Sequence, residues 1–147
     1  MSQLVSLFNG DSIPNVTDGE QWINLSSGAF CDYDNNPSLS LIYIKLYNWF
    51  AVQDERSLAP QSWHVATHGD WNELGKYISY NTPHDPPPGL KIKETGYGHW
   101  HSTIGDRPAT NVTGFTALPG GMRLDNNSVP QKVHLGVLAC LHIGGLQ

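Results

Sequence analysis

The sequence predicts a single α+β domain in which short strands and one or two short helices are joined by a large share of irregular coil. Its 147 residues are the length of one ordinary domain, and such a chain buries about two thirds of its unfolded surface. Only 14% of the residues are charged, whereas 15 Gly and 10 Pro interrupt the chain throughout. This composition argues against a helical bundle and favours short strands between irregular turns.

The first third of the chain predicts coil followed by a strand. Residues 8–38 are rich in Asn, Asp, Gly, Ser and Pro, which indicates a long ordered coil with room for one short strand. Within it, Asn9-Gly10-Asp11 predicts a tight turn, because Asn and Gly tolerate a positive φ. Residues 39–52 predict a strand, although a helix stays open because short apolar runs are ambiguous. The period-two apolar side consists of Ile42, Ile44, Leu46, Phe50 and Val52.

The middle of the chain predicts a turn, a short strand and a helix. Residues 58–65 indicate the turn and the strand, and residues 68–80 indicate a short amphipathic helix. We expect the Thr67 side chain to cap this helix, with Asp70 at the third helical position. The apolar face of the helix follows the helical repeat and consists of Trp71, Leu74 and Ile78.

The following residues predict turns and one further strand. Residues 81–90 contain four prolines, which we expect to exclude a helix and a central strand. Phe115, Ala117 and Leu118 predict a strand that enters a tight bend at Pro119. Because no repeat of fixed period and no linker divide the chain, residues 1–147 are expected to form one domain.

Four segments carry a resemblance to a known family. They are Ile13-Pro-Asn-Val-Thr-Asp18; Leu46-Tyr-Asn-Trp-Phe-Ala-Val52 with Leu58-Ala-Pro-Gln-Ser-Trp-His-Val65; Lys93-Glu-Thr-Gly96 with His99-Trp100; and Thr110-Asn-Val-Thr-Gly-Phe-Thr-Ala-Leu-Pro-Gly-Gly121. Their order and spacing, from about residue 8 to residue 127, resemble the Fibrobacter succinogenes major paralogous domain, called FISUMP. The run from Gly114 to Gly121 is its most specific piece.

The resemblance implies a C-type-lectin-like fold with a small twisted antiparallel sheet. It also implies a distant similarity to the formylglycine-generating enzymes and to the variable proteins of diversity-generating retroelements. Domains of this kind are typical of secreted or surface-anchored bacterial proteins, and related folds lie at the tips of phage fibres. The family has no established catalytic residues, so the resemblance assigns none here.

Both ends of the chain depart from the family pattern. The family has more chain before the turn at Asn9, and residues 128–147 lack the Trp-containing stretch expected there, so this tail is divergent. The first and last strands of this fold normally pair with each other, and the two departures affect both of these strands. The sequence therefore leaves open which residues form that pair. Three explanations stay open: a shifted reading frame near Ser128, a genuine substitute strand, or an interface segment for a partner.

Several partners and locations are disfavoured by composition. The net charge is −5 and Lys and Arg are scattered, so the basic stripe typical of nucleic-acid binding is missing. The most apolar segment, residues 133–146, is too short to span a bilayer, and we expect no direct membrane insertion. No secretory signal is visible in residues 1–8, so an extracellular protein would have lost it or would leave inside a particle. Cys31 and Cys140 either pair or remain two buried thiols.

Few residues suggest metal binding or catalysis. Asp32 and Asp34 begin like a calcium loop, but the sixth and twelfth positions hold Pro37 and Tyr43, so we expect these carboxylates to solvate a turn. His99 and the residue two further on would share one side of a strand, yet two histidines are too few for a closed metal site. The standard catalytic motifs are missing as well. We therefore expect no metal, no cofactor and no enzymatic activity.

The remaining expectation is recognition. An aromatic and polar stretch around residue 100 is typical of a platform for a sugar or a protein surface. The sequence predicts a non-catalytic recognition or adhesion domain that binds a glycan or protein at a cell or virion surface. The alternative is a structural component of a phage fibre, a virion or a surface assembly, including a homo-oligomer. The candidate ligand-binding residues are Tyr97, His99, Trp100, His101, Asp106, Arg107 and Asn111.

Overall fold

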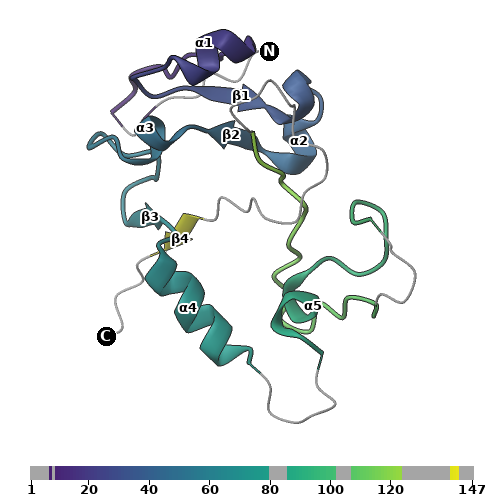
Figure 1. Cartoon of the computed structure of the whole chain (residues 1–147). Coiled ribbons are helices and arrows are strands. Elements are labelled where there is room, and N and C mark those ends of the chain that lie inside the picture. The colour runs from purple at the N-terminus through teal and green to yellow at the C-terminus, as the bar shows by residue number, and fades with distance from the viewer. Residues whose placement is uncertain (1–6, 8, 80–85, 102–106, 124–139, 143–147) are drawn as a thin grey trace. The chain divides into compact units, whose positions relative to one another are not determined.

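Helices and short antiparallel strands both occur in the chain, so the predicted mixture of α and β structure is confirmed. The computed structural model describes residues 7, 9–79, 86–101, 107–123 and 140–142 (Figure 1). The chain divides into two compact units. Unit 1 comprises Met1–Ala66 and Gly120–Gln147, and unit 2 comprises Thr67–Pro119. One domain over residues 1–147 stays a prediction.

Unit 1 begins with a tight turn and a short helix. The backbone N–H of Asp11 donates to Oδ1 of Asn9 at 3.1 Å, and Gly10 has φ +91°, which confirms the predicted turn. Helix α1, Gly19–Ile23, lies in the segment predicted as coil. It forms because the Asp18 side chain accepts a hydrogen bond from the Gln21 backbone at 2.8 Å.

The sheet of unit 1 lies next to its apolar core. Strand β1, Phe30–Asp32, pairs antiparallel with β2, Lys45–Tyr47, and one residue of β1 also forms a parallel bridge to Asn15. The one strand expected within residues 8–38 is therefore present, and the short helix η1, Tyr33–Asn35, follows it. Two buried clusters pack here: Leu7, Ile13 and Phe30 in one, and Trp22, Ala29 and Cys31 in the other.

Residues 39–52 are not one strand, so that prediction is wrong outside β2. Helices α2, Ser40–Tyr43, and α3, Trp49–Val52, lie on either side of the strand. Ile44 turns the chain with φ +64°, and Asn48 caps α3 by accepting a hydrogen bond from the Ala51 backbone at 3.0 Å. The period-two pattern misleads because three of its five members, Ile42, Ile44 and Phe50, are exposed.

A second two-stranded antiparallel sheet also belongs to unit 1. Strand β3, Trp63–Val65, follows the predicted turn, and its backbone pairs with β4, Cys140–His142 (Figure 1). Because β4 lies in the divergent tail, this pairing supports the explanation that the tail provides a substitute strand. Cys31 is a buried free thiol, so it carries no disulfide.

Arg123 connects the two ends of unit 1. Its guanidinium donates hydrogen bonds to the carbonyl oxygens of Val16 and Thr17 at 2.9 and 2.8 Å. The same group lies 4.5 Å from the centroid of the Trp22 ring, a cation–π contact. A single side chain thereby fixes the segment before α1 to a residue more than 100 positions further along the chain.

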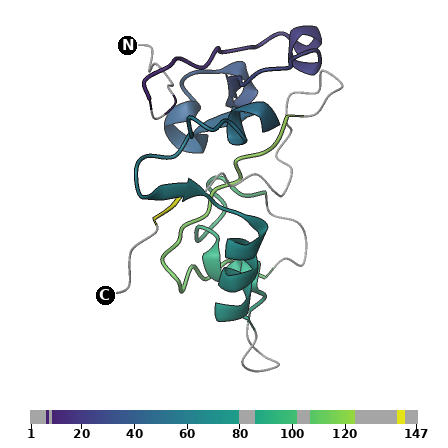
Figure 2. The same ribbon diagram turned by 90° about the vertical axis from the view of Figure 1, so that its left-hand side faces the viewer.

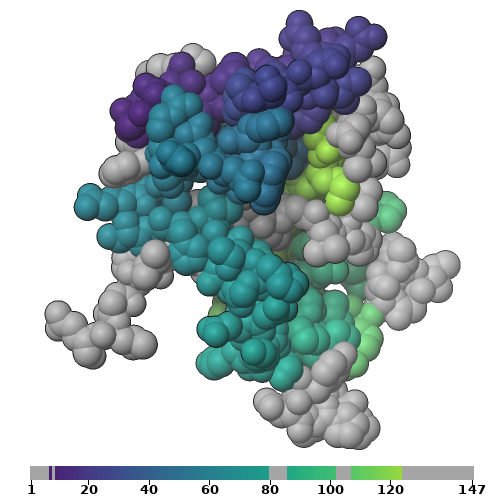
Figure 3. Space-filling view, turned by 60° about the vertical axis from the view of Figure 1, so that its left-hand side comes forward, coloured from purple at the N-terminus to yellow at the C-terminus, as the bar shows by residue number. Residues whose placement is uncertain are grey.

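Unit 2 contains the longest described helix, α4, His68–Tyr77, which confirms the predicted helix (Figures 1 and 2). A capping box begins it, because the Asp70 backbone donates to Oγ1 of Thr67 and the Thr67 backbone donates to the Asp70 carboxylate. No residue of α4 is fully buried, and Figure 3 shows the teal atoms of this helix on the molecular surface.

Helix α5, Pro88–Ile92, corrects the prediction that residues 81–90 exclude a helix. Pro88 occupies the first helical turn, where a missing N–H removes no helical hydrogen bond. The predicted strand around Phe115 is also wrong. Ala117 forms only an isolated parallel bridge to Lys93, because Thr116, with φ +55°, breaks the extended conformation.

The number of helices exceeds the predicted one or two, since caps at Asp18 and Asn48 begin helices of about one turn. None of the helices in the described parts of the chain has the length and apolar character needed to cross a membrane.

Candidate ligand-binding surface

Backbone hydrogen bonds join α5 to a segment further along unit 2. The backbone of Thr110 donates to the Leu90 carbonyl, and that of Ala117 donates to the Ile92 carbonyl, both at 2.8 Å. The Glu94 backbone in turn donates to the Ala117 carbonyl at 3.1 Å. Residues 107–117 therefore run beside α5, as Figures 1 and 2 both show. We call α5, residues 93–101 and residues 107–117 the α5 loop surface.

The first loop of this surface is closed by a carboxylate and an imidazole. Oε2 of Glu94 lies 2.8 Å from Nδ1 of His99, and both side chains are partly buried. Gly96 has φ +79°, a left-handed conformation that favours glycine. Tyr97, next in the chain, is 49% exposed. The contact between Glu94 and His99 thus holds the loop closed, and the loop exposes the Tyr97 side chain.

Trp100 fixes the base of the same loop. Its Nε1–H donates to the Ala117 carbonyl at 2.9 Å, and the Lys93 ammonium lies 4.1 Å from its ring centroid. A cation over the ring contributes roughly 0.5–1 kcal/mol where it is solvent-exposed. Trp100 therefore holds two chain segments together. The sequence predicts Trp100 only as a ligand-binding residue and does not predict this structural contribution.

The second loop is closed by Asn111. Its Oδ1 accepts a hydrogen bond from the Thr116 backbone at 2.9 Å, and its Nδ2 donates to the Thr116 hydroxyl at 2.8 Å. Within this loop, Val112 is 70% exposed and Phe115 is 37% exposed. The Phe115 ring also packs edge-on against Trp71 of α4, with centroids 6.3 Å apart. Asn111 therefore shapes the loop that exposes two apolar side chains.

The structure brings most of the predicted ligand-binding residues into one surface. His99, Trp100 and Asn111 brace its loops, whereas Tyr97 and His101 are exposed. The two remaining candidates differ: Arg107 is exposed, and Asp106 lies outside the described residues.

The expected strand geometry for a histidine pair is not present, because residues 99 and 101 lie in an irregular segment. Among the residues that the structure describes, no three His, Cys, Asp or Glu side chains gather to hold a metal ion.

Unit 1 contains a buried ionic cluster that sequence reasoning missed. Asp32 is only 3% exposed, lies 2.6 Å from the Lys45 ammonium, and accepts hydrogen bonds from Ser40 and Asn15. Burial raises the pKa of the Asp32 carboxyl, but these hydrogen bonds outweigh it, so the pKa lies below its usual range. The expectation that Asp32 solvates a turn is wrong, whereas Asp34 is exposed.

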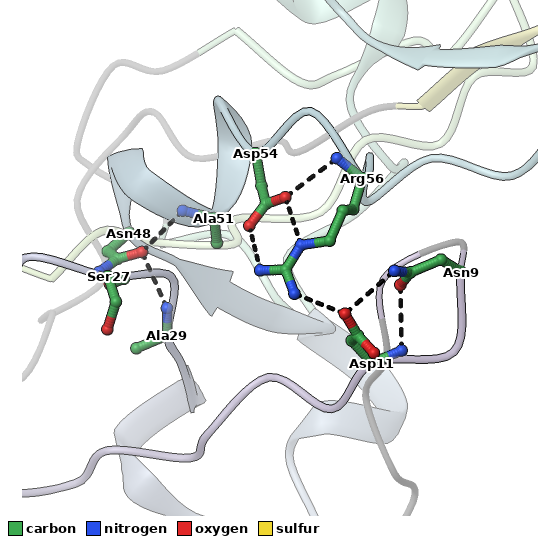
Figure 4. Close-up of polar contacts among 8 residues, drawn as sticks. All are labelled: Asn9, Asp11, Ser27, Ala29, Asn48, Ala51, Asp54 and Arg56. Atoms are coloured by element: carbon green, nitrogen blue, oxygen red, sulfur yellow. Dashed lines mark hydrogen bonds and ion pairs between the residues drawn. The ribbon is translucent and has the colours of Figure 1, made fainter.

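Two further polar groups stabilise unit 1 (Figure 4). The Asn48 amide accepts hydrogen bonds from the Ala29 and Ala51 backbones and donates to the Ser27 carbonyl. Arg56 forms a two-pronged ion pair with Asp54, with nitrogen–oxygen distances of 2.9 and 2.7 Å. The hydrogen bond from the Arg56 side chain lowers the pKa of Asp54 to about 2.

Together these features define a mixed α/β chain with a buried polar and apolar core in unit 1 and braced, exposed loops in unit 2. The model of the Fibrobacter succinogenes major domain family matches residues 3–135, about nine tenths of the chain. The chain belongs to this family, which confirms the resemblance carried by the four sequence segments. No curated protein and no solved structure matches the chain.

Proposed function

We propose that this chain is a non-catalytic recognition domain that binds a glycan or a protein ligand at the outer surface of a cell or of a virion. The observation that carries the proposal is the α5 loop surface. Its two loops are closed by side-chain contacts, Glu94 with His99 and Asn111 with Thr116. They expose three large apolar side chains: Tyr97, Val112 and Phe115.

This arrangement suits binding for a physical reason. Ordering a flexible loop on binding costs conformational entropy, so loops that are already braced leave more of the contact energy for affinity. Exposed aromatic rings supply a large contact area, and Tyr97 adds a hydroxyl that can exchange hydrogen bonds with a ligand. Binding residues are also commonly found on loops that a rigid scaffold positions.

The fold and the location are part of the same proposal. A C-type-lectin-like fold is supported by family membership together with short antiparallel strands, short helices and abundant coil. An extracellular or cell-surface location, or alternatively a virion, follows from the same resemblance and is an argument by analogy. We propose no enzymatic activity, no cofactor and no nucleic-acid partner, since the sequence contains no motif for them.

The experiment compares two exposed tyrosines of unit 2. A glycan array and a thermal-shift screen against surface extracts first identify a ligand for the wild-type chain. We expect Tyr97→Ala to weaken binding of that ligand at least tenfold, because truncating a tyrosine that anchors an interface costs about 2 kcal/mol or more. The control is Tyr77→Ala on α4, because Tyr77 is 86% exposed and lies outside the α5 loop surface.

Two results would count against the proposal. In the first, Tyr97→Ala and Tyr77→Ala bind the ligand as tightly as the wild-type chain does. In the second, the wild-type chain gives no signal with any glycan or extract.

A second candidate function is assembly, as a structural component of a fibre, a virion or a surface complex. It is favoured by exposed apolar side chains in unit 1, where Leu41, Ile44 and Trp49 are 82%, 59% and 64% exposed. Exposed apolar side chains that form a contiguous patch are commonly covered in an assembly. We expect light scattering to show an oligomer that Trp49→Gln weakens. A monomer at all concentrations would contradict this second candidate.

A further inference from the structure

We propose that the turn at Asn9-Gly10 is a site of spontaneous deamidation, at which the Asn9 amide becomes a carboxylate, and that the new charge destabilises this part of unit 1. The proposal is independent of the recognition function. Its first observation is a sequence pair, because Asn9 is the only asparagine of the chain that is followed by glycine. Glycine has no Cβ atom, so its backbone nitrogen is the least hindered nucleophile that can attack the preceding amide.

The reaction uses only the chain and water. The Gly10 backbone nitrogen loses its proton to hydroxide and attacks Cγ of Asn9, which forms a cyclic imide. The bond between Cγ and Nδ2 breaks, and Nδ2 leaves as ammonia after it takes a proton from water. Water then opens the imide at either carbonyl, which leaves aspartate at position 9 or its β-linked isomer. Overall, water is consumed and the amide becomes a carboxylate and an ammonium ion.

The second observation is the geometry of the turn, which exposes and activates the amide (Figure 4). Asn9 and Gly10 are both exposed, and a Cβ atom built on Gly10 would meet no atom within 4 Å, so water reaches both reacting groups. The Asp11 backbone N–H donates to Oδ1 of Asn9 at 3.1 Å. This donor stabilises the negative charge that develops on Oδ1 when the Gly10 nitrogen attacks Cγ.

One contact of the turn opposes the reaction. The Gly10 N–H donates to the Leu7 carbonyl at 2.9 Å, so this hydrogen bond has to open before the nitrogen can lose its proton. An exposed turn opens locally more often than the whole chain unfolds, because few buried contacts are lost. We therefore expect deamidation to occur in the folded chain, at a lower rate than in the unfolded chain.

The third observation is the charge that surrounds Asn9. Nδ2 of Asn9 and a guanidinium nitrogen of Arg56 both donate to Oδ2 of Asp11, at 3.0 and 2.5 Å. Arg56 also pairs with Asp54, so two carboxylates already share one cation and these three side chains carry a formal charge of −1. Deamidation replaces the Nδ2 donor by a third carboxylate beside Asp11 and changes this charge to −2.

The new carboxylate is expected to weaken the turn most at neutral pH. The hydrogen bond from Asn9 is the main cause that holds the pKa of Asp11 below its usual range, so its loss raises that pKa. The loss of stability is therefore complete where both carboxyls are ionised, and it disappears as they are protonated in acid. The turn lies between Leu7 and Ile13, which pack with Phe30 in a buried cluster, so the effect reaches the core of unit 1.

Peptide mapping by mass spectrometry tests the reaction. The whole chain is kept folded in mildly alkaline buffer, and the exchange of the amide NH₂ for OH is followed over time at each asparagine. The internal control is Asn72, which is exposed on α4 but is followed by Glu73. We expect Asn9 to convert at least about tenfold faster than Asn72, which corresponds to a barrier about 1.4 kcal/mol lower. Equal rates at the two positions, or conversion of Asn9 only in urea, would overturn the proposal.

Two variants test the effect on stability. Asn9→Asp has the same covalent structure as the aspartate product, whereas Asn9→Ser keeps a side-chain oxygen for the Asp11 N–H without a charge. Both variants lose the Nδ2 donor, so a difference between them reports the charge. In urea denaturation at neutral pH and low salt, we expect the unfolding equilibrium constant of Asn9→Asp to be about threefold that of Asn9→Ser, and high salt to reduce the difference. Equal stability of the two variants at low salt would overturn the second part of the proposal.

Discussion

The two units of the chain differ in what holds them together. In unit 1, apolar side chains such as Leu7, Phe30 and Trp22 are buried, and Asp32 and Lys45 form an ion pair among them. In unit 2, the fully buried side chains among the described residues are few, and hydrogen bonds between α5 and residues 110–117 join the segments instead. This difference indicates that the buried contacts that stabilise the fold are concentrated in unit 1, whereas unit 2 offers braced loops for contact.

The largest expected effect comes from the buried ion pair of unit 1. Asp32→Asn leaves the Lys45 ammonium, which is 12% exposed, without its counter-charge, and we expect a loss of roughly 2–3 kcal/mol in the free energy of unfolding. The matched control is Asp34→Asn, because Asp34 is an exposed neighbour with φ +54°, a conformation that asparagine tolerates. We expect this control to change the free energy of unfolding by less than about 0.5 kcal/mol. Urea denaturation measures both. Equal losses in the two variants would show that the buried ion pair contributes no more to the free energy of unfolding than the exposed carboxylate does.

The next effect in size comes from Asn48. Asn48→Ala removes two accepted hydrogen bonds and one donated bond, and we expect it to cost roughly 2 kcal/mol. Asn48→Asp keeps both accepted bonds to the Ala29 and Ala51 backbones and loses only the donated one, so about half of that loss is expected. Thermal unfolding of the two variants measures the difference. If the aspartate variant is no more stable than the alanine variant, the cap of α3 contributes nothing.

A smaller effect is the dependence of stability on acid. The pKa of Asp54 is about 2 and that of Asp32 is also lowered, so in the folded chain both stay ionised below the ordinary aspartate value of 3.8. Stability from these groups is complete above pH 4 and is lost as the pH falls toward 2, because the unfolded chain binds protons first.

Arg56→Gln removes the partner that lowers the pKa of Asp54. We therefore expect the thermal midpoint of this variant to fall less steeply between pH 4 and pH 2 than that of the wild-type chain. Identical slopes would show that the Arg56 pair has no influence on the stability of unit 1.

The sequence could predict the features that local interactions determine. The turn at Asn9 and the capping box of Thr67 and Asp70 each depend on residues two or three positions apart, so their signals stand next to each other in the chain. For β1, the sequence predicts only one short strand at an unspecified place within residues 8–38. The period-two apolar pattern does not predict helices α2 and α3. The backbone of Ile44, with φ +64°, ends α2, and the Asn48 side chain begins α3, so these two local features decide the structure.

The candidate site was predicted in part for a similar reason. The aromatic and polar residues around Trp100 marked the right stretch, but their division into exposed and bracing side chains depends on contacts with residues 111–117. The buried position of Asp32 had no local signal, since Lys45 lies 13 residues away and Asn15 lies 17 residues away. The exposure of the site residues and the burial of Asp32 therefore depend on contacts between distant segments, which local sequence patterns do not predict.

The most direct measurement takes two variants and reads both stability and ligand binding. Tyr97→Ala is expected to unfold at the same urea concentration as the wild-type chain and to bind the identified ligand at least tenfold more weakly. Asp32→Asn is expected to unfold at lower urea and, while folded in buffer, to bind the ligand with wild-type affinity. The reverse result, a destabilised tyrosine variant that still binds and a stable aspartate variant that does not, would contradict the division between a stabilising unit 1 and a recognising unit 2.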